Sequence, residues 1–257
     1  GWLAVTMARD DDWAVLPAWL GFDDPSGWDE IAHTVASGSA TAIVERGTLL
    51  GLAVALLPTT PSGVTAVSRT PIDGEAVTPR PLTDVVVVDL SSLWAGPLCG
   101  SLLADAGATV LKVESTSRPD GARLGPPAFF DLLNAGKRSV AVDLATSTGV
   151  TVLRQLIDQA DVVIESSRPR ALEQLGIDAA ASLTAGRTSA WVSITGHGRT
   201  GAGRNRVAFG DDAAVAGGLV CWSESQPCFC ADAVADPLAG LAAATAVIEA
   251  LAERGRW

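Results

Sequence analysis

The sequence predicts an α/β protein with a doubly wound parallel sheet, and three observations support this. Val85–Val88 is a continuous β-branched run, typical of a strand that is buried on both faces of a parallel sheet. After Leu82, short apolar runs alternate with helical patterns, as strands and crossover helices do in doubly wound folds. Hydrophobic residues make up 48% and charged residues 18% of the 257 residues, which is enough for a sizeable core and argues against disorder.

The regular part of the chain supplies the sheet. A turn at Gly96-Pro97 opens a helix that ends near Ala106, and Ser147–Gln159 has the apolar spacing of a second helix. The predicted strands are Val85–Val88, Thr109–Val113, Ser139–Val142, Val162–Ile164 and Ala190–Ile194. Ligands of such sheets bind at the carboxyl ends of the strands, so the loops that follow them are the places to look.

The first part of the chain differs from the rest. Residues 1–60 form a small appended segment, with a short helix near Trp19, another from Asp29, and a helix and a strand over 41–57. Residues 61–81 are rich in Pro, Thr, Ser and Gly, which is typical of a linker. The large domain is expected over residues 82–257.

Charge and cysteine content restrict the possible functions. The net charge is −11, which disfavours nucleic-acid binding. Leu49–Leu57 is too short to span a bilayer and Gly1–Asp10 lacks the features of a secretory signal, so we expect a cytoplasmic protein with no membrane partner. The four cysteines and two histidines fit no zinc pattern, so we expect no metal. We expect free and mostly buried thiols. The alternative is a disulfide among Cys221, Cys228 and Cys230, which would be unusual in the cytosol.

The stretch from Cys230 to Gly255 contains the main catalytic candidate. Asp236 precedes Pro237 and an Ala-rich helical pattern, with an apolar face predicted at Leu238, Leu241, Ala244, Ile248 and Leu251. Asp is a favoured N-cap and Pro a favoured first helical residue. The positive end of the helix would favour the ionised carboxylate. Two interpretations stay open on this pattern: Asp236 caps the helix, or it is a nucleophile toward an activated acyl group.

Five motifs in order resemble those of the family III CoA-transferases, which include formyl-CoA transferase, carnitine CoA-transferase and α-methylacyl-CoA racemase. The motifs are DLSSLWAGPLCGSLLADAGATVLKVES (Asp89–Ser115), NAGKRSVAVDL (Asn134–Leu144), ADVVIESSRPRALEQLGI (Ala160–Ile177), WVSITGHGRTGAG (Trp191–Gly203) and ADPLAGLAAA (Ala235–Ala244). The resemblance covers residues 82–257. It implies a Rossmann-like large domain, usually within an interlocked homodimer.

The resemblance also implies an activity. It places Asp236 on the family's catalytic aspartate, which moves CoA between an acyl-CoA and a carboxylic acid through a covalent aspartyl intermediate. Coenzyme A is then a substrate, and its phosphates need cations. The residues that the resemblance and the strand-end loops suggest for CoA binding are Leu93, Trp94, Ala95, Lys137, Arg138, Ser166, Ser167, Arg168 and Arg170. Trp94 either stacks on CoA or packs internally, and Lys137 either contacts phosphate or pairs with a surface acid.

Departures from the family pattern keep alternatives open. Phe209 stands where racemases of the family carry a histidine, and Phe cannot transfer a proton, although Asp211 and Asp212 lie close by in sequence. The fourth-strand motif has Ser166-Ser167 where Asn-Phe is usual. The family's motifs beyond the Asp236 helix are absent from this sequence, so a rearranged protein, one half of a two-part enzyme and a fragment all stay open. The alternative functions are an acyl-CoA racemase or isomerase, or a non-catalytic CoA-binding subunit that needs a complementary chain.

Overall fold

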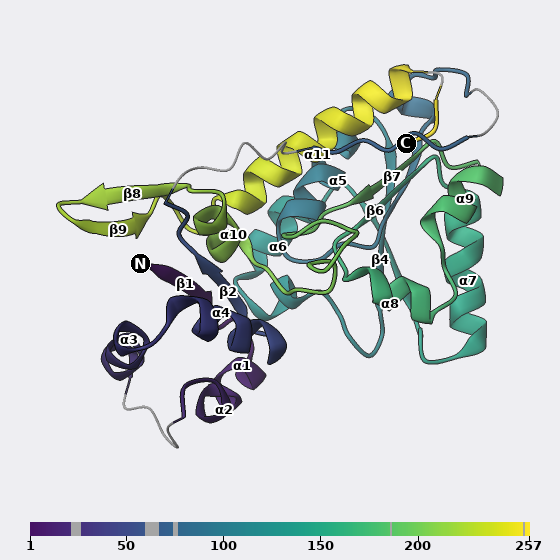
Figure 1. Ribbon diagram of the computed structural model, residues 1–257. Coiled ribbons are helices and arrows are strands. Elements are labelled where there is room, and N and C mark those ends of the chain that lie inside the picture. The colour runs from purple at the N-terminus through teal and green to yellow at the C-terminus, as the bar shows by residue number, and fades with distance from the viewer. Residues whose placement is uncertain (22–26, 60–66, 74–76, 186, 254) are drawn as a thin grey trace. The chain divides into compact units, whose positions relative to one another are not determined.

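The computed structural model describes residues 1–21, 27–59, 67–73, 77–185, 187–253 and 255–257 (Figure 1). The chain divides into two compact units. Unit 1 comprises Gly1–Val64 and Gly196–Asp236, and unit 2 comprises Thr65–Thr195 and Pro237–Trp257. Parts of the predicted linker at 61–81 (residues 61–66 and 74–76) lie outside the described residues.

Unit 2 contains a five-stranded parallel sheet, which confirms the predicted fold class. The strand order is β5-β4-β3-β6-β7. The strands are β3 (Val86–Asp89), β4 (Thr109–Ser115), β5 (Arg138–Val142), β6 (Val162–Glu165) and β7 (Ala190–Ser193). From β3 the chain adds β4 and β5 on one side and later adds β6 and β7 on the other. The strand order therefore reverses between β3 and β6, which makes this the switch point of the sheet.

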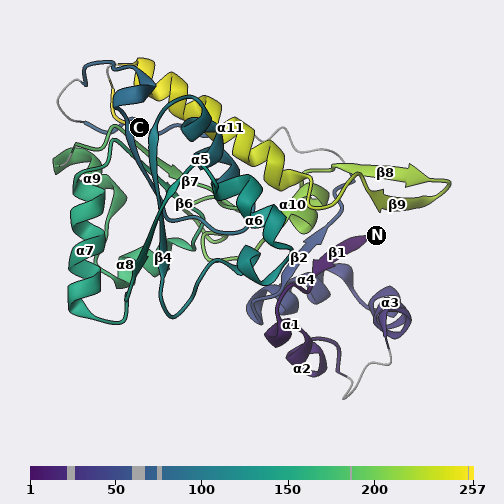
Figure 2. The ribbon, with the colours of Figure 1, turned by 180° about the vertical axis from the view of Figure 1, so that it is seen from behind.

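Helices cover both faces of this sheet (Figures 1 and 2). On one face, α5 (Ala95–Asp105) and α11 (Ala235–Ala252) pack against Val87 and Ile164. On the other face, α7 (Ser147–Asp158) and α8 (Pro169–Gln174) pack against Val88 and Val163. Successive residues of one strand thus face different helical layers, as the period of a strand requires. The remaining helices of unit 2 are η1 (Leu82–Asp84), η2 (Gly121–Leu124), α6 (Pro127–Asn134) and α9 (Ala179–Ala185).

The buried face of α11 differs from the predicted one. Gly240, Ala243, Ala244, Val247 and Ala250 are buried, whereas Leu238, Leu241 and Ile248 are 50%, 56% and 45% exposed. The helix is apolar all round, so its periodicity does not determine a face, and small residues permit the close approach to α5. A Cβ on Gly240 would lie 2.6 Å from the carbonyl oxygen of Ala95. By length and composition α11 also qualifies as a membrane span, but core helices of soluble proteins pass the same test.

Unit 1 is built on a two-stranded antiparallel sheet of β1 (Leu3–Thr6) and β2 (Ala53–Leu56). Its hydrophobic core contains Leu16, Trp19, Ile31, Leu52 and Val54. The helices of the N-terminal segment are α1 (Asp10–Ala14), α2 (Leu16–Leu20), α3 (Trp28–Ser37) and α4 (Ala40–Leu49). The short helices and the strand expected over residues 1–60 are therefore present, while β1 was not predicted.

Residues 196–236 join the N-terminal residues in unit 1. Helix α10 (Gly210–Ala216) packs against β1 and β2, and Arg206 donates a hydrogen bond to the carbonyl of Val54 at 3.1 Å. An antiparallel hairpin of β8 (Val220–Ser223) and β9 (Gln226–Phe229) follows α10. The sequence analysis placed residues 196–236 in the domain 82–257, so it did not predict their grouping with the N-terminal segment. The domain limits of 1–60, 61–81 and 82–257 stay a prediction.

Candidate functional site

The switch point of the sheet brings two predicted loops together. The backbone N–H of Ser92, after β3, donates to the Oγ of Ser166, after β6, at 3.1 Å. Leu93, Trp94 and Ala95 follow directly on the first loop. Ser167, Arg168 and Arg170 follow on the second. These predicted CoA-binding residues therefore lie at the switch point of the sheet, the position at which open α/β sheets bind their ligands.

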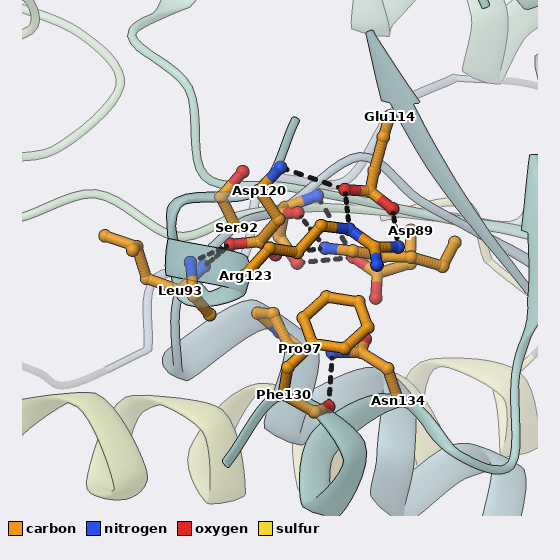
Figure 3. A network of polar contacts seen from close by, with 12 residues as sticks. Asp89, Ser92, Leu93, Pro97, Glu114, Asp120, Arg123, Phe130 and Asn134 are labelled. Carbon is orange, nitrogen blue, oxygen red and sulfur yellow. Dashed lines mark hydrogen bonds and ion pairs between the residues drawn. The ribbon is translucent and has the colours of Figure 1, made fainter. Parts of the chain in front are cut away.

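A buried ion pair holds the first loop in an uncommon conformation (Figure 3). Leu93 has a φ of 70°, the left-handed region that non-glycine residues avoid. Asp120 accepts the Leu93 N–H at 2.9 Å through Oδ1, and its Oδ2 lies 2.8 Å from the Nζ of Lys112. Lys112 also donates to the carbonyl of Ser91, and the side chains of Lys112 and Asp120 are 2% and 0% exposed. Such a conformation costs on the order of 1–3 kcal/mol and persists where the surroundings determine it, as they do here.

Lys137 lies beneath the same loop and not on the surface. Its Nζ lies 2.8 Å from Asp89 Oδ2, 2.8 Å from the carbonyl of Pro97 and 3.0 Å from Asn134 Oδ1, with the side chain 1% exposed. Burial lowers the pKa of the Lys137 ammonium, and the Asp89 carboxylate opposes that shift. Asp89 also accepts the N–H of Ser91 at 3.0 Å. The structure thus gives Lys137 an acidic partner, the second of its two alternatives, but the pair is buried.

A third polar cluster borders the loop on its exposed side. Glu114 accepts from Arg123 Nε at 2.9 Å and Nη2 at 2.6 Å, and from the Asp120 N–H at 2.9 Å. The hydrogen bonds from Arg123 lower the pKa of Glu114. The Arg123 guanidinium also lies 4.0 Å from the ring centre of Phe130, a cation–π contact (Figure 3). These contacts tie η2 and α6 to the loop that carries Leu93.

The other predicted CoA-binding residues differ in their surroundings. Trp94 is half-buried and packs edge-on against Phe129, with ring centres 5.2 Å apart. Arg138 and Arg170 are exposed and Arg168 is half-buried. The Ser167 hydroxyl donates to Glu165 at 3.3 Å. Arg138 and Arg170 are thus the predicted cations that solvent reaches most readily.

The sequence reasoning missed Asp89, Lys112 and Asp120, which position the loop. One signal was available: Lys112 interrupts the apolar strand Thr109–Val113, and a charge inside a parallel sheet needs a partner. Asp120, by contrast, lies in a turn cluster where the sequence gives no hint of burial.

Asp236 lies in unit 1, in the first turn of α11, which begins at Ala235. It is therefore not the N-cap that was predicted. Burial, and then the charges of Asp211, Asp212 and Asp232, raise the pKa of the Asp236 carboxyl to about 6. This direction is opposite to the predicted one, because burial and like charges outweigh a helix end that contributes about 0.3–1 kcal/mol. Such a carboxyl is still mostly ionised at pH 7, and it is more basic than an ordinary aspartate.

A tight turn fixes the Asp236 backbone. The Asp236 N–H donates to the carbonyl of Ala233 at 2.9 Å, and the Ala233 N–H donates to Asp211 Oδ1 at 2.8 Å. Ala233 has a left-handed φ of 45°. A Cβ on Gly210 would lie 2.5 Å from the Ala233 carbonyl oxygen, so Gly210 makes room for the turn. Asp211 thus holds the turn of Asp236 as well as raising its pKa.

The racemase alternative finds little support in α10. Phe209 caps α10, and its N–H donates to Asp212 Oδ1 at 2.7 Å. Asp212 is fully buried, and its Oδ1 also accepts from the Thr6 hydroxyl at 3.3 Å, whereas its Oδ2 has no hydrogen-bond partner among the described residues. Asp211 accepts the Ala233 N–H. Burial raises the pKa of Asp212 to about 6. His197, in the loop after β7, is half-buried, and burial lowers its pKa.

The chain belongs to CoA-transferase family III, whose model matches residues 82–256. It is 34% identical over 190 residues to succinyl-CoA–D-citramalate CoA-transferase of Chloroflexus aurantiacus, covering 69% of this chain and 47% of that protein. It is also 34% identical over 155 residues to the beta subunit of succinyl-CoA–L-malate CoA-transferase of the same organism, covering 58% and 38%. A CaiB/BaiF family protein from Brucella suis superimposes with a TM-score of 0.61 at 34% identity, covering 68% of this chain and 50% of that one. The chain thus spans about half the length of these relatives.

Proposed function

We propose that the protein transfers CoA from an acyl-CoA to a free carboxylic acid, with Asp236 as the acyl-accepting nucleophile. The observation that carries the proposal is the raised pKa of Asp236, which lies within the family's ADPLAGLAAA motif. A carboxylate of raised basicity is a stronger nucleophile, and at pH 7 most of it is still ionised. Succinyl-CoA is the first donor to test, because relatives that the chain resembles use it by name.

The first half-reaction moves CoA onto the enzyme. A carboxylate oxygen of Asp236 attacks the carbonyl carbon of the donor thioester, the C–S bond breaks, and CoA leaves as its thiolate. The product on the enzyme is a mixed anhydride of Asp236 and the donor acid. The thiolate then attacks the Asp236 carbonyl of this anhydride, which releases the donor acid as its carboxylate and leaves an aspartyl-CoA thioester.

The second half-reaction repeats these steps with the acceptor. The acceptor carboxylate attacks the aspartyl thioester, CoA thiolate leaves, and a second mixed anhydride forms. The thiolate attacks the acceptor's carbonyl carbon, which gives the new acyl-CoA and restores the Asp236 carboxylate. No net proton is taken up, so the site needs no separate general acid.

Unit 2 provides a fitting set of groups for the nucleotide end of CoA. The loop Leu93–Ala95 is held by the buried Lys112–Asp120 pair, so its backbone is ordered before a ligand arrives. Exposed Arg138 and Arg170 are suited to the phosphates, and Trp94 offers an aromatic edge to the adenine or pantetheine. Lys137 holds the loop from below and does not contact phosphate in this proposal.

A second candidate function is a CoA-binding subunit that needs a complementary chain. It is favoured by one observation: the chain spans about half the length of its relatives, one of which is a beta subunit. Homodimer formation and a cytoplasmic location remain expectations from the sequence.

The test is a CoA-exchange assay with succinyl-CoA and an isotopically labelled acid. We expect labelled acyl-CoA with the wild type and a loss on the order of 10³-fold or more in Asp236→Asn. Asp105→Asn is the matched control, because it removes one exposed carboxylate of unit 2 and leaves the charges that raise the pKa of Asp236 in place. Binding of CoA without exchange by the wild-type chain would favour the subunit function. Equal exchange by Asp236→Asn and the wild type would refute the nucleophile assignment.

A further inference from the structure

Three of the four cysteines lie together on the β8–β9 hairpin of unit 1, which the CoA-transferase function leaves without a role. Cys221, Cys228 and Cys230 are exposed, and Cys99 is buried. This differs from the expectation of mostly buried thiols. Burial raises the pKa of the Cys99 thiol to about 12, so Cys99 is protected from the reactions that thiolates undergo.

The hairpin register places the exposed thiols on one face. Cys221 on β8 lies directly opposite Cys228 on β9. Cys230 lies directly after the end of β9, two residues beyond Cys228, which is the spacing of side chains on the same side of a strand. The face that carries the three thiols is open to solvent, because the residues of the hairpin are mostly exposed.

One pair of sulfur atoms is already in contact. The Sγ atoms of Cys221 and Cys230 lie 3.4 Å apart, although the two residues are not directly opposite in the ladder. The Cys228 thiol instead donates to the carbonyl oxygen of Gln226 on its own strand, at 3.9 Å. A disulfide requires a sulfur separation of about 2.05 Å, so the Cys221–Cys230 pair needs only a small shift to form the bond.

We propose that Cys221 and Cys230 form a reversible, redox-active dithiol that is oxidised by small-molecule disulfides such as glutathione disulfide. The thiolate of one cysteine attacks the small disulfide, which forms a mixed disulfide and releases one small thiolate. The second cysteine's thiolate then attacks the protein sulfur of that mixed disulfide and releases the second small thiolate. In sum, the protein dithiol is oxidised to a disulfide and one small disulfide is reduced to two thiols.

The Cys221–Cys230 pair lies close in sequence to the turn at Ala233–Asp236. The bond would close the base of the hairpin, where the chain leaves β9 toward Ala233 and Asp236. The oxidised hairpin would then be covalently anchored immediately before the turn that holds Asp236. Oxidation of this dithiol does not require the CoA-transferase reaction, because it depends only on the geometry of the two thiols.

The test is oxidation of the full chain with glutathione disulfide, followed by thiol counting and peptide mapping by mass spectrometry. A protease specific for Glu cleaves after Glu224 and separates Cys221 from the other two thiols, and chymotrypsin cleaves after Phe229 and separates Cys228 from Cys230. We expect two of the three exposed thiols to disappear, with a Cys221–Cys230 cross-link and no retained glutathione. Dithiothreitol should restore both thiols.

The cysteine variants provide matched controls. Cys228→Ser should oxidise like the wild type, whereas Cys221→Ser and Cys230→Ser should retain glutathione on the remaining partner and form no internal cross-link. Stable glutathione adducts on the wild type, a Cys221–Cys228 cross-link, or covalent dimers between chains would each overturn the proposal. Because the cysteines are exposed, Ser variants are expected to fold, and an unchanged circular dichroism spectrum checks this.

Discussion

At the residue scale, the proposed chemistry depends on the electrostatic environment of the Asp236 carboxyl. Its place in the first turn of α11 favours the carboxylate, but burial and the charges of Asp211, Asp212 and Asp232 act in the other direction and prevail. The sequence pattern predicted Asp236 as the catalytic candidate, and that role stays a prediction. The pattern could not give the direction of the pKa shift, because Asp211 and Asp212 approach only through the fold of unit 1.

The raised pKa predicts the pH dependence of activity. Because only the carboxylate attacks, kcat/KM should rise with pH and level off above an apparent pKa of about 6. Asp211→Asn keeps an oxygen acceptor for the Ala233 N–H but removes a like charge, so its acid limb should move to lower pH. Asp105→Asn, an exposed change of equal charge in unit 2, is the control and should leave the profile unchanged. A profile that is identical in Asp211→Asn and the wild type would contradict this electrostatic account.

At the element scale, the loop after β3 depends on charges buried beneath it. Lys112→Met would leave Asp120 buried without its cationic partner, and we expect a loss of roughly 3–5 kcal/mol in the free energy of unfolding. The double variant Lys112→Met/Asp120→Asn should recover much of that loss, because no buried charge is left unpaired. Arg123→Met, which breaks a partly exposed pair, should cost about 1 kcal/mol or less. Urea denaturation measures all three, and equal losses for Lys112→Met and Arg123→Met would speak against the buried pair's role.

The contact of α11 with α5 is a second element-scale test. In Gly240→Ala the new Cβ would lie 2.6 Å from the Ala95 carbonyl oxygen, and a backbone atom there cannot simply rotate away. We expect a loss of about 1–3 kcal/mol in unfolding free energy, together with weaker CoA binding because Ala95 ends the loop. Ala242→Ser, a small change at another position of α11, should alter neither quantity. Thermal unfolding and CoA titration test this, and an unchanged melting temperature in Gly240→Ala would be the contrary result.

The helices and strands differ in how well their sequence patterns predicted them. The five strands of unit 2 were predicted to within a residue or two, because buried parallel strands are continuous apolar runs. The predicted face of α11 was wrong at Leu238, Leu241 and Ile248, although Ala244 is buried, since a helix that is apolar on every side has no periodic signal. The β8–β9 hairpin was missed because its turn, Glu224-Ser225, lacks the Asn-Gly or Asp-Gly signature, even though Glu224 adopts a φ of 56°.

At the scale of the whole molecule, the proposed roles fall in different compact units. The loops that we assign to CoA lie in unit 2, and Asp236 with its neighbouring acids lies in unit 1. The five family motifs and the strand-end loops predicted both sets of residues from the sequence. The association of residues 196–236 with the N-terminal segment was hidden, because contacts such as Thr6 with Asp212 join positions far apart in the chain.

Because the proposed roles are divided in this way, we expect substitutions in unit 2 to change mainly KM and substitution of Asp236 to change mainly kcat. Trp94→Ala, which removes an aromatic side chain from the loop in unit 2, should raise the KM for acyl-CoA by roughly 10-fold with a smaller effect on kcat. Asp236→Asn should abolish kcat and leave the Kd for CoA within about 3-fold of the wild type. Steady-state kinetics and isothermal titration calorimetry with CoA separate the two effects. A large loss of CoA affinity in Asp236→Asn would contradict the division of roles.

The most direct measurement of the central claim is trapping of the covalent intermediate. The wild-type protein is incubated with succinyl-CoA and hydroxylamine, which converts an aspartyl anhydride or thioester into a stable hydroxamate, and is then mapped by mass spectrometry. The account predicts a hydroxamate on Asp236 that requires succinyl-CoA and is absent from Asp236→Asn. An unmodified Asp236 in protein that is turning over succinyl-CoA, or a hydroxamate on another acid such as Asp232, would contradict it.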